Sequence, residues 1–192
     1  ENMLGVLKLH VHGSVHNARI LKEAGVPYLI MYRDLRDVAV SHVFYVQRTP
    51  WHPEHPDYKG LSIEEGLQHF GQTILSEFVE WIRSWHSNRD SETSLIVRYE
   101  DLLTDTTIAF RKVARLFDLP DDSDTIQQIV EAHRFENLSG GRSRGEDEDD
   151  SFFRKGVSGD WKNHFTPDLK KLYKKKAGQA LIDFGYETDL DW

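Results

Sequence analysis

The chain has 192 residues, which suits one domain with a full core over residues 1–192, and it contains no cysteine. Its formal net charge of −8 excludes a general affinity for nucleic acid or anionic lipid, and the lack of cysteine excludes disulfides and thiolate metal sites. No apolar run approaches the roughly 20 residues of a membrane span, so we expect a cytoplasmic protein without a membrane partner.

Apolar patterning predicts alternating strands and helices at the start of the chain. Residues 4–12 alternate between apolar and polar side chains, which is typical of a strand with one polar face. A helix is expected over residues 15–24, and the continuous apolar run 26–32 is typical of a strand buried on both faces. Asp34 can then cap a helix that ends near Gln47.

The middle of the chain is predicted to contain a loop, a long helix and a second buried strand. The prolines of residues 50–60 predict the loop, and apolar residues at steps of three and four over residues 62–87 predict the helix. Residues 94–99 are another short apolar strand. Further helices are expected over residues 102–117, 123–133 and 166–184, the last capped by Thr166 with Pro167 after it.

These elements together predict the fold class. Strands that alternate with helices are typical of a doubly wound α/β structure in which helices flank a small parallel sheet. In such sheets ligands bind at the carboxyl ends of the strands. The glycine-rich, charged segment 139–151 is predicted to be a mobile acidic loop.

One candidate anion site follows the buried strand 26–32. Arg33 comes directly after the strand, beside the helix that Asp34 caps, and Ser41 lies two turns further along. Free backbone N–H groups, the helix dipole and a bidentate guanidinium all favour a phosphate at such a junction. The alternative is a surface ion pair between Arg33 and Asp34 or Asp37, and both interpretations stay open.

The first predicted strand carries a second candidate site. Lys8 and His10 are two residues apart on its polar face, where they could supply a cation and a general base, since imidazole titrates near neutral pH. The histidines at positions 10, 12 and 16 could instead be solvated or hold a metal. Metal binding is less favoured, because only His10 and His12 share a face.

A third candidate is the basic segment that follows the acidic run GEDEDD. Arg154, Lys155 and Gly156 combine two cations with a residue that lets backbone N–H groups approach a ligand closely. A charge-assisted hydrogen bond contributes about 1.5–3 kcal/mol, so several bonds to one phosphate would select it strongly. The alternative is a basic turn that neutralises the acidic run, although the GDWKNHF that follows is typical of a packed corner.

Two of these segments resemble motifs of the sulfotransferases that use 3'-phosphoadenosine 5'-phosphosulfate (PAPS), above all the cytosolic and bacterial small-molecule type. Residues 154–166, RKGVSGDWKNHFT, resemble that family's RKGxxGDWKxxFT segment, which contacts the 3'-phosphate of the nucleotide. Residues 32–45, YRDLRDVAVSHVFY, are similar to the strand–helix segment whose arginine and serine bind the same phosphate. The resemblance implies that the cofactor-binding residues include Arg33, Ser41, Arg154, Lys155 and Gly156.

Three further motifs are collinear with this family, so that the resemblance covers residues 7–184. KLH is similar to the family's KTH, whose histidine is the catalytic base, which implies that role for His10 and makes Lys8 a candidate for stabilising charge. RYEDLL resembles the FYEDL-type strand end and implies that Tyr99 lies near the adenine. HRFENL implies that Phe135 packs on the base.

Two departures from the family pattern bear on activity and assembly. The family's PKSGTTW-type loop, which holds the 5'-phosphosulfate and includes a catalytic lysine, has no match in these residues. We expect that loop upstream of Glu1, or else the chain is a degenerate relative, and we expect these 192 residues alone to be weak or inactive. The family's dimer segment KxxxTVxxxE reads KNHFTPDLKK, and Pro167 and Lys171 argue against that form of dimer.

The resemblance implies a layered fold like that of the P-loop NTPases and transfer of a sulfuryl group from PAPS to a hydroxyl or amine of a small-molecule acceptor, without a metal. Adenosine 3',5'-bisphosphate (PAP) would be the product. The main alternative is an impaired module that binds PAP or PAPS; a metal-dependent hydrolase is another, and a kinase lacks its GKS or GKT loop. We expect an acceptor pocket near residues 49–60.

Overall fold

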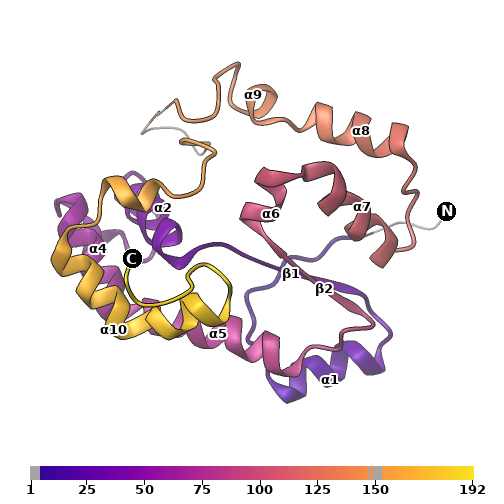
Figure 1. Cartoon of the computed structure of the whole chain (residues 1–192), viewed down its shortest axis with the longest axis horizontal. Coiled ribbons are helices and arrows are strands. Elements are labelled where there is room, and N and C mark those ends of the chain that lie inside the picture. The colour runs from indigo at the N-terminus through magenta and orange to yellow at the C-terminus, as the bar shows by residue number, and fades with distance from the viewer. Residues whose placement is uncertain (1–4, 147, 149–152) are drawn as a thin grey trace.

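The computed structural model describes residues 5–146, 148 and 153–192 and has an α/β fold (Figure 1). Its described residues contain one sheet of two parallel strands, β1 (Tyr28–Tyr32) and β2 (Ser94–Arg98), which pair in register along their whole length. Parallel pairing places both carboxyl ends at one edge of the sheet. The prediction of helices around a small parallel sheet is therefore confirmed.

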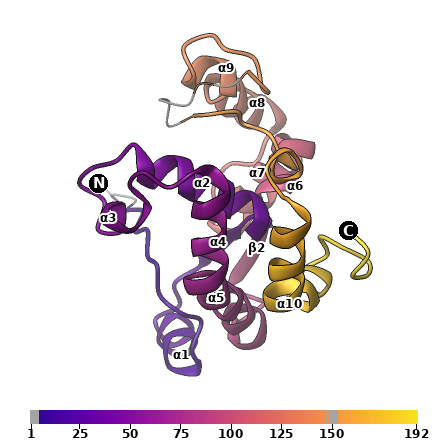
Figure 2. The same ribbon diagram turned by 90° about the vertical axis from the view of Figure 1, so that its left-hand side faces the viewer.

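The helices form two groups on opposite sides of the strands (Figure 1). The first group comprises α2 (Leu35–Gln47), α4 (Ile63–Thr73), α5 (Leu75–Asn88) and α10 (Pro167–Asp183). The second group comprises α6 (Tyr99–Thr104), α7 (Thr106–Leu116), α8 (Ser123–Ala132) and α9 (Phe135–Leu138). Helix α1 (Val15–Glu23) lies at the opposite end of the molecule from α8 and α9 (Figure 2). Among the described residues, no helix has the length and apolarity needed to cross a membrane.

The main core lies where α2, α4, α5 and α10 pack against one another. Glycines let these helices approach closely: a Cβ at Gly66 would lie 2.7 Å from the Val43 side chain, and one at Gly71 would lie 2.8 Å from side chains of α10. The Tyr173 hydroxyl donates to the Leu67 carbonyl at 2.9 Å, which satisfies this polar group inside the core. Helix α2, and the loop that precedes it, therefore rest on a packed helical base.

Helix ends confirm several predicted boundaries. The Asp34 carboxylate caps α2 by accepting a hydrogen bond from the Arg36 amide at 2.9 Å. Thr166 caps α10 in the same way, accepting from the Leu169 amide at 3.4 Å, with Pro167 at the first helical position. The bounds of α1, β1, β2 and α8 lie within two residues of those predicted.

Two predicted helices are each broken into two. The helix expected over residues 62–87 is interrupted at Ile74, one residue after Thr73, whose hydroxyl donates to the His69 carbonyl at 2.7 Å. Such side-chain bonds to the preceding turn bend helices. The helix expected from residue 102 begins earlier, at α6, and is interrupted by Asp105, which caps α7.

The proline-rich segment predicted to be a loop contains a one-turn helix, α3 (His55–Tyr58). The Tyr58 ring at its end is fully buried, which draws the segment onto the core. The His55 ring is hydrogen-bonded through Nδ1 to the Val46 carbonyl at 2.8 Å, which fixes the start of the turn on α2. Burial of one tyrosine thus overrides the loop-forming composition.

The N-terminal segment differs from its prediction. Residues 5–12, the described part of the predicted strand, have no regular structure, and Leu7 is 80% exposed, so the strand prediction is wrong there. The segment is attached near its end, where the indole N–H groups of Trp81 and Trp85 donate to the Val11 carbonyl at 2.8 and 3.0 Å. An alternating pattern forms a strand only beside another backbone, and no described strand pairs with this one.

Candidate functional site

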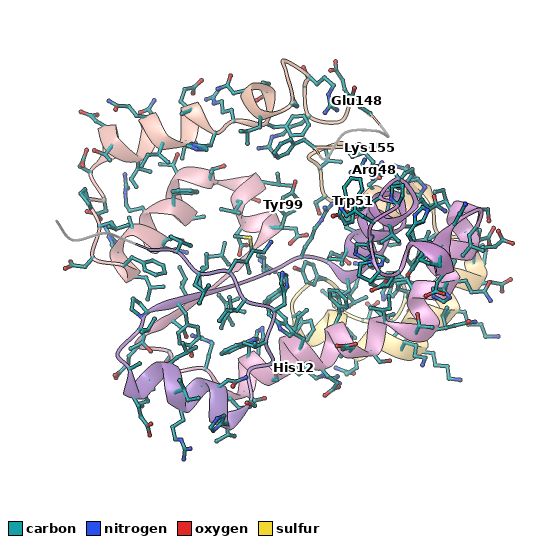
Figure 3. The ribbon with its side chains drawn as sticks, turned by 180° about the vertical axis from the view of Figure 1, so that it is seen from behind. His12, Arg48, Trp51, Tyr99, Glu148 and Lys155 are labelled. Carbon is teal, nitrogen blue, oxygen red and sulfur yellow. The ribbon has the colours of Figure 1, made fainter. Side chains whose placement is uncertain are left out.

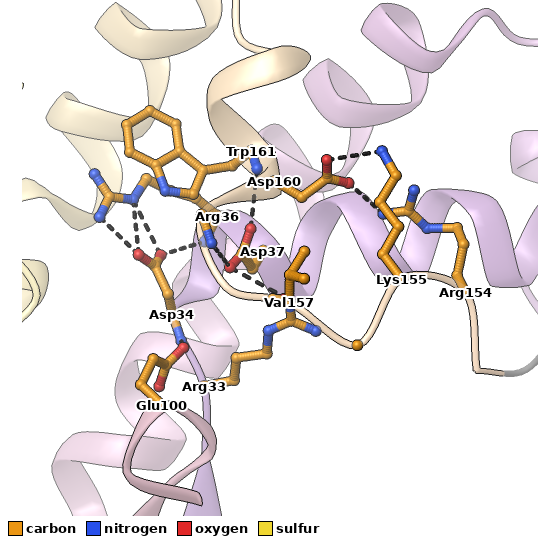
Figure 4. A network of polar contacts seen from close by, with 12 residues as sticks. Arg33, Asp34, Arg36, Asp37, Glu100, Arg154, Lys155, Val157, Asp160 and Trp161 are labelled. Atoms are coloured by element: carbon orange, nitrogen blue, oxygen red, sulfur yellow. Dashed lines mark hydrogen bonds and ion pairs between the residues drawn. The ribbon is translucent and has the colours of Figure 1, made fainter. Parts of the chain in front are cut away.

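The loop between β1 and α2 begins a buried polar cluster at the carboxyl edge of the sheet (Figure 4). The Arg36 guanidinium, 2% exposed, donates to the Asp34 carboxylate at 2.7 Å. It also contacts two indole rings that lie nearly perpendicular to each other, with its Cζ 3.9 Å from the centre of Trp161 and 4.4 Å from that of Trp192. Burial raises the pKa of the Asp34 carboxyl despite these bonds. The pair joins the start of α2 to η1 (Asp160–Asn163).

The Arg33 side chain has different partners. Its Nη2 donates to the Val157 carbonyl at 2.7 Å and lies 3.3 Å from Asp37 Oδ2, while its Cζ lies 4.5 Å from the centre of the Tyr99 ring. The ion pair with Asp37 that the sequence left open is therefore present, but Asp37 is 1% exposed and is not a surface group. Nε of Arg33 is buried without a hydrogen-bond partner in the described structure, which leaves one donor of this guanidinium unsatisfied.

Asp37 binds the backbone of residues 159–161 to α2. Its carboxylate accepts hydrogen bonds from the Gly159 amide at 2.6 Å and the Trp161 amide at 2.9 Å (Figure 4). Gly159 has φ of +84°, a conformation that favours glycine and lets the chain turn into η1. The side chain that pairs with Arg33 thus also fixes the backbone that Arg33 contacts.

Arg154 and Lys155 converge on one buried carboxylate. Asp160, 4% exposed, accepts from Lys155 Nζ at 2.9 Å and from the Arg154 guanidinium, and Asn163 donates to it at 3.0 Å. Burial by itself would raise the pKa of the Asp160 carboxyl, but the bonds from Arg154, Asn163 and Lys155 outweigh it and hold this pKa far below its usual range. The two cations are therefore oriented by the packed corner that follows them.

Gly156 packs directly against Phe135, the first residue of α9. Its φ is +65°, and a Cβ on it would lie 2.5 Å from the Phe135 ring, so that no larger residue fits without movement. Phe135 is 6% exposed. The structure thus brings together five residue positions that the sequence singled out, namely Arg33, Phe135, Arg154, Lys155 and Gly156, with Tyr99 against Arg33.

Three other predicted site residues are not joined to this cluster. Ser41 lies on α2 and is exposed, and the structure gives it no hydrogen bond to a described residue. Lys8 and His10 are exposed in the irregular N-terminal segment, equally without bonds to described residues. This segment runs toward His12, which lies beside α1 and α5, apart from Tyr99 and Lys155 (Figure 3).

Sequence reasoning missed two carboxylates that organise the site, Asp160 and Glu100, and named the third, Asp37, only as a possible partner of Arg33. Asp37 and Asp160 are described above, and Glu100 accepts from the Asp34 amide at 3.2 Å and from the Tyr186 hydroxyl at 3.0 Å. Asp37 follows Arg33 by four residues at the start of a helix, a spacing that brings side chains together, so the sequence could suggest this pair. The other two are long-range contacts or depend on a non-helical turn, for which the sequence carries no signal.

The predicted acidic loop lies partly outside the described residues, which exclude residue 147 and residues 149–152. Its described part folds back on the basic segment: the Gly145 amide donates to the Lys155 carbonyl at 2.8 Å, and Arg142 donates to the carbonyls of Phe153 and Arg154 at 2.6 and 2.8 Å. Its predicted mobility stays a prediction. This loop therefore holds the backbone of residues 153–155, while α2 holds that of Gly159 and Trp161.

In chemical terms the cluster offers three oriented cations, an unsatisfied guanidinium N–H and a glycine turn packed against an aromatic ring. Its two buried carboxylates orient the cations in advance, so that anion binding does not require the free energy of ordering these side chains. Guanidinium groups and backbone N–H groups recognise phosphate oxygens, and an aromatic ring nearby can pack on a base. In the described residues no group of three or more His, Asp or Glu side chains could hold a metal ion.

Comparison with protein families finds a match to one model, described as "Sulfotransferase domain", over residues 3–185. The 3-alpha-hydroxysteroid sulfotransferase of Cavia porcellus is 30% identical over 178 residues, which cover 86% of this chain and 60% of that protein. Sulfotransferase 1 family member D1 of Rattus norvegicus is 28% identical over 170 residues, or 81% of this chain and 56% of that one. The chain thus spans less than two thirds of the length of these relatives.

Solved structures with the same fold include a mouse sulfotransferase, SULT7A1, complexed with PAP. It superposes with a TM-score of 0.67 at 20% identity, covering 86% of this chain and 65% of that one. Retinol dehydratase in a complex with retinol and PAP superposes with a TM-score of 0.67 at 22% identity, covering 85% of this chain and 50% of that one. These likenesses establish the layered α/β fold predicted from sequence.

Proposed function

Because the chain belongs to the sulfotransferase domain family, we propose that it forms the 3'-phosphate-binding part of an enzyme that moves a sulfuryl group from PAPS to a small-molecule acceptor. An acceptor hydroxyl or amine forms a bond to sulfur, the bond between sulfur and the 5'-phosphate oxygen breaks, and PAP leaves. The relatives named above are sulfotransferases, and the two similar structures are PAP complexes. Both facts support the proposal.

The observation that carries the proposal is the junction between Arg33 and residues 154–157. Arg33, Arg154 and Lys155 are cations from two distant parts of the sequence, and the Arg33 contact with the Val157 carbonyl joins those parts. The buried, unpartnered Nε of Arg33 is a donor of the kind that a phosphate oxygen would accept from. These residues fit the 3'-phosphate of the nucleotide.

The cations would act mainly by holding and neutralising the nucleotide. Sulfuryl transfer resembles phosphoryl transfer in that charge is spread over non-bridging oxygens, so positioned donors contribute most of the stabilisation. Phe135 and Tyr99 are the proposed contacts of the adenine. Ser41 is proposed to donate its hydroxyl to the phosphate. The motif likeness alone supports this assignment, because Ser41 makes no bond to a described residue.

His10 is proposed as the general base that takes the proton from the acceptor as the new bond to sulfur forms, with Lys8 as a cation beside the transferred group. The support is the likeness of KLH to the family's KTH motif. Both side chains lie in the irregular segment of residues 5–12, so these roles require that segment to become ordered. The second candidate function, a module that binds PAP without catalysis, is favoured because Lys8 and His10 are not joined to the cluster of cations.

Titration calorimetry with PAP, beside turnover of radiolabelled PAPS with a panel of alcohols and phenols, separates the two functions. We expect PAP to bind, Arg33→Ala to weaken binding at least tenfold, and these 192 residues to transfer little sulfuryl group. Arg83→Ala, an exposed arginine on α5, is the control and should leave PAP binding unchanged. Absence of PAP binding would refute the proposal for this site, and robust turnover would refute the expected inactivity.

A further inference from the structure

The charges around the basic segment are largely compensated within the protein. Among the described residues, Asp37 lies against Arg33, and Asp160 is shared by Arg154 and Lys155, so buried carboxylates accompany all three cations. A phosphate monoester at neutral pH carries a charge of about −1.5 to −2. The site would therefore bind such a group more strongly with a further cation that lacks a carboxylate partner.

Arg144 is a cation of this kind. Its Nη1 donates to the Gly156 carbonyl at 3.0 Å, and its Cζ lies 5.8 Å from the centre of the Phe135 ring. The next residue is joined to the same stretch, because the Gly145 amide donates to the Lys155 carbonyl. Arg144 is exposed, and within the described structure it forms no ion pair with a carboxylate. Its guanidinium has five N–H donors and uses one of them here.

We propose that Arg144 is a further nucleotide-binding residue, which donates to the phosphate monoester at the 3' position. The proposal rests on the proposed function, because it assumes that this phosphate lies at the turn of Gly156. The guanidinium is held by a carbonyl of that turn, beside the ring proposed to pack on the base. Of the described arginines bonded to this turn, Arg33 is paired with a carboxylate and Arg144 is not.

A purely structural role for Arg144 is the competing explanation, and Arg142 already fills that role. The Arg142 side chain is 18% exposed, pairs with Glu148 at 2.9 Å and donates to the carbonyls of Phe153 and Arg154. Arg142 thus closes the loop onto the basic segment with two backbone bonds. Arg144 contributes one such bond and is exposed, so a ligand can reach it.

The test compares two nucleotides that differ only in the 3'-phosphate, PAP and adenosine 5'-monophosphate, by titration calorimetry with the full chain. Arg144→Ala should weaken PAP binding about tenfold, which corresponds to about 1.4 kcal/mol. It should leave binding of the monophosphate within about twofold, because that nucleotide lacks the 3'-phosphate. Arg144→Lys should lose less than Arg144→Ala, because it keeps the charge. Arg134→Ala is the matched control: it removes an exposed arginine next to Phe135 that pairs with Glu131, and should change neither affinity.

The outcomes separate the two proposals. Equal losses for both nucleotides, or none, would overturn the role of Arg144 while leaving the proposed function intact. A parent chain that binds PAP no better than the monophosphate would refute the 3'-phosphate site itself, and the role of Arg144 with it. Thermal unfolding of each variant checks that the fold is kept, and Arg144→Lys decides the matter if Arg144→Ala is unstable.

Discussion

Two segments proposed to serve one reaction are held by the fold in opposite ways. Residues 153–161 are tied to α2 and to their own turn by two buried carboxylates, Asp37 and Asp160. Residues 5–10, with Lys8 and His10, are exposed and have no hydrogen bond to a described residue. Both segments carry functional candidates, yet one is oriented in advance and the other is not.

The difference teaches that a loop and a strand need different support. A loop can be fixed by a few side chains that accept its backbone N–H groups, and α2 provides one in Asp37. A strand needs a neighbouring backbone along its whole length, and the described sheet consists of β1 and β2 alone. The phosphate side of the site therefore depends on few residues, and single substitutions should disrupt it.

Asp37→Ala should have the largest effect. It leaves the amides of Gly159 and Trp161 without their acceptor and the Arg33 guanidinium without its ion-pair partner, and removal of one buried partner costs about 3–5 kcal/mol. We expect the free energy of unfolding in urea to fall by about 4 kcal/mol and PAP binding to be lost. Asp57→Ala, an exposed carboxylate, is the control, and a loss below about 1 kcal/mol for Asp37→Ala would contradict the role given to Asp37.

Gly156→Ala should come next. A Cβ there would lie 2.5 Å from Phe135, and the φ of +65° adds strain, together about 2–3 kcal/mol of unfolding free energy. Gly25→Ala is a matched control, because Gly25 has φ of +61° and nothing within 4 Å of its Cβ position. The control should lose about 1 kcal/mol from strain alone. Equal losses for the two variants would show that contact with Phe135 is unimportant.

Asp160→Asn should cost about 2 kcal/mol of unfolding free energy near pH 7, because charge-assisted bonds are lost. The pKa of Asp160 is held below its usual value, so its contribution is complete above about pH 5 and is lost as the pH falls below the usual carboxyl pKa of about 3.9 toward the lower pKa of the folded state. The difference from the parent should therefore shrink below pH 4. A pH-independent difference would contradict the depressed pKa; exposed Asp124→Asn is the control.

His10→Ala and Lys8→Ala should have the smallest effects on the fold. Both side chains are exposed, and surface substitutions usually change stability by less than about 0.5 kcal/mol. PAP binding by these 192 residues should also be unchanged, whereas turnover by a longer, active protein should be lost with His10→Ala. A marked loss of stability would show that residues 5–12 are packed, and would remove the contrast between the two segments.

How far the sequence predicts this molecule depends on the range of the interactions involved. Local signals sufficed for β1, for the cap of α2 by Asp34 and for the start of α10, because each depends on neighbouring residues. The turn at Tyr58 depends on packing between distant elements, and the pattern of residues 5–12 depends on a neighbouring strand. The break at Ile74 lies next to a local side-chain bond from Thr73, which apolar periodicity does not reveal.

The candidate site divides in the same way. Motif likeness singled out Arg33, Arg154 and Lys155, and the structure joins their segments through Val157. Asp37 accepts from backbone amides that are distant in sequence, and Asp160 reaches Arg154 and Lys155 across a non-helical turn, so neither set of bonds has a sequence signal. Arg144 lies in a segment whose composition predicted only a mobile loop. Residue type alone does not indicate which charges a fold will bury.

The contact of Arg36 with both Trp161 and Trp192 gives the molecule an optical reporter. The two indole rings lie 5.4 Å apart at 83°, close enough for their electronic transitions to couple, and a guanidinium lies within 4.4 Å of both ring centres. Because Asp37 fixes the Trp161 amide, a shift of residues 157–161 relative to α2 would change this stacking. Near-ultraviolet circular dichroism and intrinsic fluorescence can therefore follow the phosphate side of the site without a label.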